Sequence, residues 1–334
     1  MTVSFPSPLR IGALRLASPL LLAPLAGISD LPFRLLAREQ GCALVFTEMI
    51  SAEGIVRKHK KTSRFLQSSP EERPLAVQLF GDRSEVLAEA ASIVEQMGAD
   101  GVDINMGCPV RKVVGGGSGA ALLKDPARIE EIIRAVRRRI TVPLTIKIRS
   151  GWDEKGKNFL EIGKIAEGAG VDALILHGRT RSQNYGMKAD WEVIRLAREH
   201  LGIPVIGNGD MLAPQAIVNF FDQTSCPGAM IGRGSLGNPW IFRSALQLLR
   251  GEPLGEPSLE EKEGTILRHL HMAAELHGEV LTAKEFRKHL IWYTRGLRGC
   301  VDLRVRIPGW QTIAEMVRGI QDFFYGLKNS LALS

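Results

Sequence analysis

Eight short apolar runs, each followed by a stretch with helical spacing, constrain the fold of this chain more than any other feature. The runs are continuously apolar rather than alternating, which is typical of parallel strands covered on both faces. Eight strand–helix units within about 240 residues predict an α/β fold of the (β/α)8 TIM-barrel type. The predicted strands lie at residues 20–26, 43–48, 75–80, 101–105, 144–148, 173–177, 204–208 and 229–232.

Capping residues at the start of the intervening segments support the same division. Asp82 or Ser84 is placed to cap a helix over 85–97, and Asp125 precedes a proline that opens a helix over 127–139. A doubly wound open sheet is the alternative topology. No Gly-x-Gly-x-x-Gly turn follows the first strand, which disfavours a dinucleotide-binding sheet.

The last quarter of the chain has a different pattern. Residues 251–257 form a linker rich in Gly, Pro and Glu. After it, apolar residues recur at helical spacing and no strand signal follows. We therefore expect the barrel to occupy residues 1–250 and a small C-terminal α-helical domain to occupy residues 258–334.

Positive charge is concentrated in two places, and the net charge is +7. Residues 281–310 hold seven basic and two acidic side chains, and a second basic cluster lies at residues 57–64. Basic runs are often only solvated surface, but two dense clusters in one chain favour a polyanionic partner such as a nucleic acid.

The cysteines and the first residues of the chain indicate the cellular compartment to expect. The four cysteines lie far apart and form no Cys-x-x-Cys pair, so neither a disulfide framework nor a metal site is expected. The first residues lack the basic stretch followed by an apolar stretch that a secretory signal would have. The apolar run at 20–26 is too short to cross a bilayer. We expect a cytoplasmic protein, monomeric and without a membrane partner.

Cys108 is the most informative of the residues at the predicted strand ends. It lies in an Asn-x-x-Cys-Pro turn directly after the strand at 101–105. Proline disfavours helix at the preceding residue, so the thiol is presented on a loop at a carboxyl strand end, where barrels hold their active sites. The alternative is a buried structural cysteine.

Glycine-rich turns follow the last two predicted strands, as Asn208-Gly209-Asp210 and Gly232-Arg233-Gly234. Backbone N–H groups after strands seven and eight form the usual phosphate site of a barrel, which predicts a ligand phosphate here.

Three further strand-end side chains suit a flavin. Lys147 is a cation between apolar neighbours and is suited to stabilise a reduced flavin anion. Gln78 can donate to and accept from a flavin edge. His177 is either a donor to a substrate carbonyl or a satisfied strand-end histidine.

Several motifs together resemble the tRNA-dihydrouridine synthases, and the bacterial B-type subgroup in particular. They are Ala-Pro-Leu-Ala-Gly at 23–27, Asp-Ile-Asn-Met-Gly-Cys-Pro at 103–109, Ile-Lys-Ile-Arg-Ser-Gly-Trp at 146–152, His-Gly-Arg-Thr-Arg at 177–181 and Phe-Arg-Lys-His-Leu at 286–290. The resemblance implies an FMN flavoprotein that uses NADPH, or NADH, to reduce specific tRNA uridines to 5,6-dihydrouridine, in the D-loop for this subgroup. The FMN-binding residues it implies are Ala23, Pro24, Leu25, Gln78, Lys147, His177, Asn208, Gly209, Asp210, Gly232 and Arg233.

The resemblance also implies that Cys108 is the catalytic acid. Hydride from reduced FMN would reach C6 of uracil, and the thiol would protonate C5. A stacked base cannot reach a barrel floor, so the uridine would be extruded from its stack. Three places depart from the family pattern. Leu25 stands where methionine is usual, the glycines at 115–119 predict a more mobile loop, and Gly186 stands one residue earlier than expected.

Basic side chains on the predicted catalytic rim and in the tail are the expected tRNA contacts. They are Arg57, Lys58, Lys60, Lys61, Arg111, Lys112, Arg179, Arg181, Lys284, Arg287, Lys288, Arg295 and Arg298.

Two other classes of function remain open at this point. A small-molecule flavin dehydrogenase for a free pyrimidine or dihydroorotate would share the Asn-x-x-Cys-Pro turn but would not need a basic tail. A barrel-derived RNA-binding module without chemistry would not need the set of strand-end residues.

Overall fold

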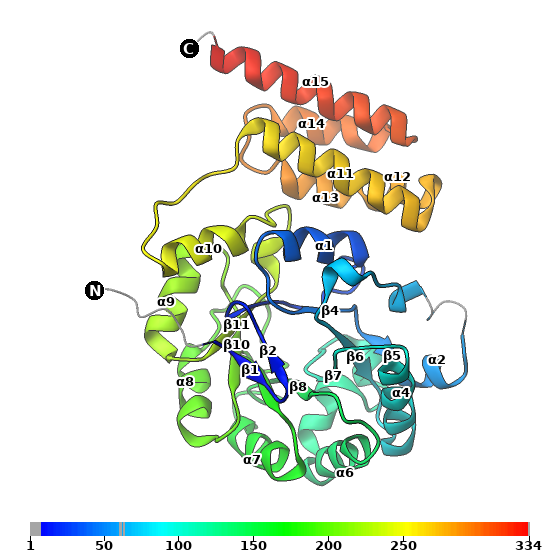
Figure 1. The fold of residues 1–334 in the computed structure, drawn as a ribbon, viewed down its shortest axis with the longest axis vertical. Coiled ribbons are helices and arrows are strands. Elements are labelled where there is room, and N and C mark those ends of the chain that lie inside the picture. Colours follow the sequence, from blue (N-terminus) through cyan, green and yellow to red (C-terminus); the bar gives the residue numbers. More distant parts are fainter. Residues whose placement is uncertain (1–7, 60–61, 63, 333–334) are drawn as a thin grey trace.

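The computed structural model describes residues 8–59, 62 and 64–332 and contains a closed barrel of eight parallel strands (Figure 1). The strands follow the order β3-β11-β10-β9-β8-β7-β6-β4, and a parallel bridge between Leu21 and Leu44 joins the two ends. The predicted TIM barrel is therefore confirmed, and the open-sheet alternative is wrong. The strands are β3 (Leu20–Leu22), β4 (Val45–Phe46), β6 (Leu75–Phe80), β7 (Gly101–Met106), β8 (Leu144–Arg149), β9 (Ala173–His177), β10 (Val205–Asn208) and β11 (Gly228–Ile231).

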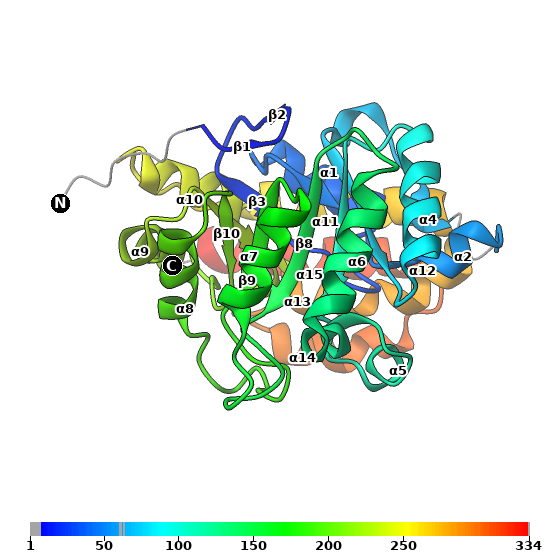
Figure 2. The same ribbon diagram turned by 90° about the horizontal axis from the view of Figure 1, so that it is seen from below.

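Helices surround the strands on the outside of the barrel (Figure 1), and a side view shows them lying along it (Figure 2). Apolar side chains between this ring and the strands form the largest core of the chain, with Ile104, Ile146 and Leu174 fully buried. The helices that follow the eight strands are α1 (Leu31–Glu39), α2 (Ala52–Val56), α4 (Ser84–Gln96), α6 (Pro126–Arg137), α7 (Phe159–Ala169), α8 (Trp191–His200), α9 (Pro214–Thr224) and α10 (Ile241–Leu249).

The predicted helix caps were right at one site and wrong at another. Asp125 caps α6 by accepting from the Arg128 backbone N–H. Ser84 is the first residue of α4 rather than its cap, and no side chain caps this helix. The physical reason is that the Ser84 hydroxyl donates to Glu131 at 2.6 Å instead.

A short hairpin that the sequence analysis did not predict closes the amino-terminal end of the barrel. It consists of β1 (Arg10–Ile11) and β2 (Leu14–Arg15). Leu9, Ile11 and Leu16 from this segment join the apolar cluster that fills the barrel interior. The interior is thereby sealed at one end, and its open mouth lies at the carboxyl ends of the strands.

Five helices after the barrel form a separate layer that stacks on the side of α1 (Figure 1). They share an apolar core of their own, and Trp240 of the barrel joins it. His277 Nε2 is hydrogen-bonded to Asp30 Oδ2 at 2.8 Å, and Lys288 donates to the Gly27 carbonyl at 2.5 Å, and these contacts fasten this layer to the barrel. The helices are α11 (Leu259–His277), α12 (Glu279–Glu285), α13 (Arg287–Tyr293), α14 (Cys300–Arg306) and α15 (Ile313–Ala332). Among the described residues, no helix is both long enough and apolar enough to span a bilayer.

A buried ion pair links α1 to the segment that precedes β6. Arg34 and Glu72 are 2% and 0% exposed, and Arg34 Nε donates to Glu72 Oε2 at 2.5 Å. The guanidinium also donates to the backbone carbonyls of Ser29 and Gln67. Removing one partner of such a pair leaves an uncompensated buried charge, which costs about 3–5 kcal/mol.

We predict that Arg34→Met lowers the free energy of unfolding by about 3 kcal/mol or more in urea titrations. Arg134→Met is the matched control, because the exposed i,i+4 pair of Arg134 with Glu130 contributes about 0.5 kcal/mol or less. Equal effects of the two substitutions would contradict a structural role for the buried pair.

Candidate active site

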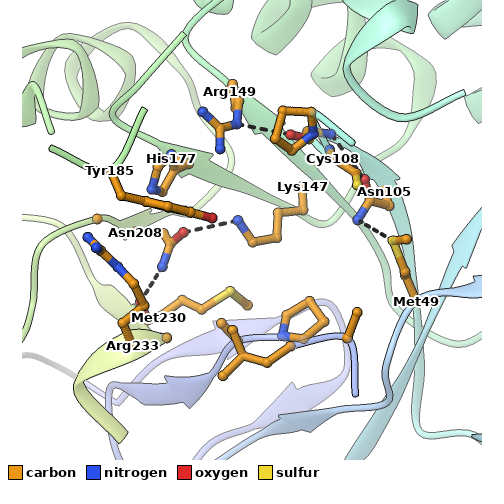
Figure 3. Close-up of a pocket in the computed structure, with 18 of the residues that line it drawn as sticks. Met49, Asn105, Cys108, Lys147, Arg149, His177, Tyr185, Asn208, Met230 and Arg233 are labelled. Carbon is orange, nitrogen blue, oxygen red and sulfur yellow. Dashed lines mark hydrogen bonds between the residues drawn. The ribbon is translucent and has the colours of Figure 1, made fainter. Parts of the chain in front are cut away.

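A cavity of about 330 Å³ opens at the carboxyl ends of the barrel strands (Figure 3). The residues that line it come from the carboxyl halves of the barrel strands and from the loops that follow them. Every residue expected to bind the cofactor, together with Cys108, lies in this wall. Those residues are Ala23, Pro24, Leu25, Gln78, Lys147, His177, Asn208, Gly209, Asp210, Gly232 and Arg233.

The turn that carries Cys108 is held by the side chain of Asn105. Asn105 Oδ1 accepts from the backbone N–H groups of Gly107 at 3.2 Å and Cys108 at 2.9 Å. Arg149, which is 5% exposed, donates from Nε to the Gly107 carbonyl at 3.0 Å. The thiol is half-buried, and this burial raises the pKa of Cys108, so the thiol is protonated at neutral pH.

The glycine-rich loop after Cys108 folds back onto it. Gly119 has φ +61°, and a Cβ there would lie 2.9 Å from the Cys108 carbonyl oxygen. The same carbonyl accepts from the Ala120 backbone N–H at 3.1 Å. Glycine at position 119 thus allows the loop backbone to pack closely against the backbone of Cys108. The greater mobility of this loop stays a prediction.

Lys147 lies at the centre of the cavity wall. Its ammonium group donates to Asn208 Oδ1 at 3.1 Å, and Asn208 Nδ2 donates to the Met230 carbonyl at 2.7 Å. Burial lowers the pKa of Lys147 to about 8, although the nearby Asp103 opposes the shift. Lys147 and Tyr185 reach towards the centre of the cavity from opposite sides (Figure 3).

His177 is a neutral imidazole in this site. Burial, followed by the positive charges of Lys147 and Arg149, holds the pKa of His177 well below its ordinary value. Its Nδ1 atom is buried, and within the described part of the chain it has no hydrogen-bond partner. A buried polar atom without a partner is costly, so this nitrogen is suited to meet a bound ligand.

The turns after β10 and β11 meet at Asp210. This carboxylate accepts from Arg179 at 2.7 Å, from Arg233 at 2.8 Å and from the Ala189 backbone N–H at 2.7 Å. Partial burial raises the pKa of Asp210, but the Arg179 and Ala189 bonds outweigh it and keep the net pKa low. Gly209 has φ +129°, and a Cβ there would lie 2.7 Å from Ala189 Cβ, so only glycine fits this turn.

Arg179 is a correction to the expected tRNA contacts. Its side chain is 1% exposed, and its guanidinium donates to both oxygens of Asp210 and to the Met187 carbonyl. It therefore supports Arg233 and the turn after β10, and it does not face solvent. The sequence does not distinguish this buried residue from the half-exposed Arg181. The guanidinium of Arg181 stacks over the Trp152 ring, 4.5 Å from its centroid.

The other expected tRNA contacts differ in how accessible they are. Arg287 is half-buried and donates to the carbonyls of Ala283 and Trp310, and Lys288 is bound to Gly27. Lys60 and Lys61 lie outside the described residues. The remaining expected contacts are exposed, and they are Arg57, Lys58, Arg111, Lys112, Lys284, Arg295 and Arg298.

Several cavity residues were missed as binding candidates. Tyr185 is 57% exposed, and the Arg233 guanidinium stacks over its ring at 4.3 Å. Met230 lies within the continuously apolar run of β11, and no sequence signal marked it as facing the cavity. Met49 follows a strand that is shorter than expected, and no sequence signal marked it. Among the described residues, no group of His, Cys, Asp and Glu is arranged to hold a metal ion.

Comparison with known proteins agrees with this geometry. Residues 21–318 match the protein family described as "Dihydrouridine synthase (Dus)". The chain is 38% identical to "tRNA-dihydrouridine synthase B" of Pseudomonas putida, over 97% of each chain. It is 41% identical to the protein of the same name from Pasteurella multocida, over 87% of this chain and 88% of that one.

Solved structures with low identity share the fold. The histamine dehydrogenase from Rhizobium sp. 4-9 matches with a TM-score of 0.58 and 14% identity, over 81% of this chain and 51% of that one. A variant of NCR from Zymomonas mobilis matches with a TM-score of 0.54 and 16% identity, over 77% of this chain and 94% of that one. The family match and the relatives together extend over nearly the whole sequence, and the chain therefore belongs to the dihydrouridine synthase family.

Proposed function

We propose that this protein reduces specific uridines of tRNA to 5,6-dihydrouridine, with FMN as its cofactor and NADPH as the reductant. The observation that carries the proposal is the convergence of Cys108 and the eleven expected cofactor residues on one cavity of about 330 Å³. This volume lies within the range of small-molecule sites. The names of the relatives support tRNA as the substrate.

The residues present fit FMN. Backbone N–H groups at the turns containing Gly209 and Gly232, together with Arg233, would hold the phosphate. Lys147 would lie against the electron-rich edge of the ring system, and the unpartnered His177 Nδ1 would meet a polar atom of the bound complex. When bound, FMN supplies a hydride equivalent obtained from NADPH.

Cys108 would supply the proton. C5 of uracil lies next to the C4 carbonyl, so adding hydride at C6 leaves an enolate that must be protonated at C5. Because burial raises the pKa of the Cys108 thiol, the proton is present at neutral pH. Asn105 and Arg149 hold the turn so that the thiol stays at the cavity wall.

The exposed cations would bind the phosphates of tRNA around the cavity mouth. Lys58 follows α2, Arg111 begins the short helix α5 (Arg111–Val114) after β7, and Lys284, Arg295 and Arg298 lie in the C-terminal helical layer. A uridine in a loop is the least costly to extrude into the cavity, and the resemblance to the B-type subgroup favours a D-loop position. We expect the enzyme to act as a cytoplasmic monomer.

One substitution tests the chemistry directly. We predict that Cys108→Ala leaves reduction of the bound flavin by NADPH within about twofold of wild type, while uridine reduction in tRNA falls by about 10²-fold or more because the general acid is lost. Flavin absorbance follows the first step, and dihydrouridine content of unmodified tRNA follows the second.

Cys300→Ala is the matched control, because Cys300 is also a half-buried free thiol but lies in the tail. Free uracil, offered in place of tRNA, tests the alternative that the enzyme acts on a small molecule. Faster flavin reoxidation by free uracil than by tRNA would overturn the proposed substrate, and full uridine reduction by Cys108→Ala would overturn the role of the thiol.

The lowered pKa of Lys147 gives a pH dependence with a definite sign. The ammonium is charged below about pH 8 and loses its proton above it, so its attraction for bound FMN declines as pH rises through 8. We predict that the FMN dissociation constant is flat from pH 6.5 to 7.5 and then rises by up to about tenfold per unit to pH 9. Fluorescence titration measures it. Lys147→Met should bind FMN more weakly and without this rise, and a rise that persists in the variant would contradict the assignment.

The tail should contribute to tRNA binding through charge. We predict that neutralising Lys284, Arg295 and Arg298 to Gln weakens tRNA binding about tenfold or more and lowers the slope of log affinity against log salt by up to about 2–3. Filter binding over a salt series measures both quantities.

The control neutralises Arg134, Lys164 and Arg195, three exposed or partly exposed cations on α6, α7 and α8. It changes the net charge by the same amount away from the proposed contact surface. Equal losses in the two triple variants would indicate a general charge effect and would remove the tail from the binding surface.

A further inference from the structure

A row of polar side chains crosses the barrel interior beneath the cavity. Gln78 of β6 pairs in register with Asp103 of β7, and Asp103 pairs with Thr145 of β8. All three are almost completely buried, with exposed fractions of 1%, 0% and 4%. An apolar cluster fills the barrel interior beside them, so a carboxylate here needs specific partners.

The carboxylate of Asp103 has a partner for each oxygen. Gln78 Nε2 donates to Oδ2 at 2.6 Å, and Thr145 Oγ1 donates to Oδ1 at 2.6 Å. Burial raises the pKa of Asp103 to about 7, against the effect of these two bonds. A protonated Asp103 keeps the same arrangement, because the Thr145 hydroxyl accepts as readily as it donates. An oxygen therefore faces Gln78 in either protonation state.

The hydrogen bonds continue from Gln78 to the turn that carries the thiol. Gln78 Oε1 accepts from Asn105 Nδ2 at 2.9 Å, and Asn105 Oδ1 accepts from the Cys108 backbone N–H at 2.9 Å. Each amide has one donating end and one accepting end, so the direction of the chain is the same at every link. An acceptor at Asp103 is what keeps the donating end of Gln78 turned away from Asn105.

We propose that Asp103 is a positioning residue, which fixes the amide of Gln78 and, through Gln78 and Asn105, holds the Cys108 turn in place. Terminal amide groups have broad rotational preferences, so Gln78 and Asn105 need such partners to keep one orientation. The benefit of holding the thiol in place rests on the proposed function. The chain of hydrogen bonds does not depend on that function.

Three substitutions separate the parts of this arrangement. Asp103→Leu has a similar size but offers no acceptor to Gln78. Asp103→Asn keeps an oxygen for Gln78, because its amide N–H₂ can donate to Thr145. Thr145→Val removes the other partner and leaves the bond between Gln78 and Asp103. Only the first should release the chain of hydrogen bonds.

The readout is alkylation of Cys108 by iodoacetamide in the FMN-saturated protein, followed by mass spectrometry over a range of pH. The background carries Cys300→Ala, and Cys42 and Cys226 are 0% and 3% exposed, so the label reports on Cys108. Asp103→Leu should react at least about fivefold faster at pH 7.5, with the pKa of the thiol moving down towards its ordinary value as the turn loosens. Asp103→Asn and Thr145→Val should stay within about twofold of the background.

An unchanged or slower reaction in Asp103→Leu would overturn the proposal. So would equal behaviour of Asp103→Asn and Asp103→Leu, since the negative charge rather than the acceptor would then matter. If Asp103→Leu does not fold, Gln78→Met breaks the same chain at its middle link, and it should accelerate alkylation too. Unchanged alkylation in Gln78→Met would overturn the proposal as well.

Activity gives a second reading. With FMN saturating, Asp103→Leu should keep flavin reduction by NADPH within about threefold and lose about tenfold or more of uridine reduction, and Asp103→Asn should restore it. A wild-type protein that reduces no uridine in tRNA would contradict the proposed function, while the alkylation series would still decide the role of Asp103.

Discussion

The closure of the sheet between Leu21 and Leu44 is the constraint on which the rest of the structure depends. Once the first and second strands of the barrel lie side by side, all eight carboxyl ends point into one mouth, and residues more than 200 positions apart in sequence share a cavity wall. Parallel register then decides which side chains are neighbours inside. It places Asn105 beside Lys147 and His177 beside Asn208, so the chemistry of the site follows from backbone pairing.

Much of this arrangement was predictable from sequence, for identifiable physical reasons. Buried parallel strands are continuously apolar, so each run marked a strand, and barrel geometry places the residues at and just after the carboxyl end of each run towards the mouth. Hence Cys108, Lys147 and Asn208 were placed correctly in the cavity wall. The hairpin of β1 and β2 was missed because two-residue strands have no measurable alternation.

The wrong predictions concern the hydrogen-bond partners of polar side chains, which cannot be read from the sequence alone. Arg179 and Arg181 are the same residue type two positions apart, yet one is enclosed by Asp210 and the other stacks on Trp152. Ser84 had the composition of a helix cap, but its hydroxyl is bound to Glu131 on a neighbouring helix. In both cases a partner far along the chain decided the outcome.

The loop between β3 and α1 contacts both the cavity and the helical layer. Pro24 and Leu25 line the cavity, while Gly27 and Asp30, a few residues on, bind Lys288 and His277 of the helical layer. Any displacement of the helical layer that keeps these two contacts must also pull on the cavity wall. The loop thus couples the two regions, and a large ligand that displaced the helices would also displace residues at the mouth of the barrel.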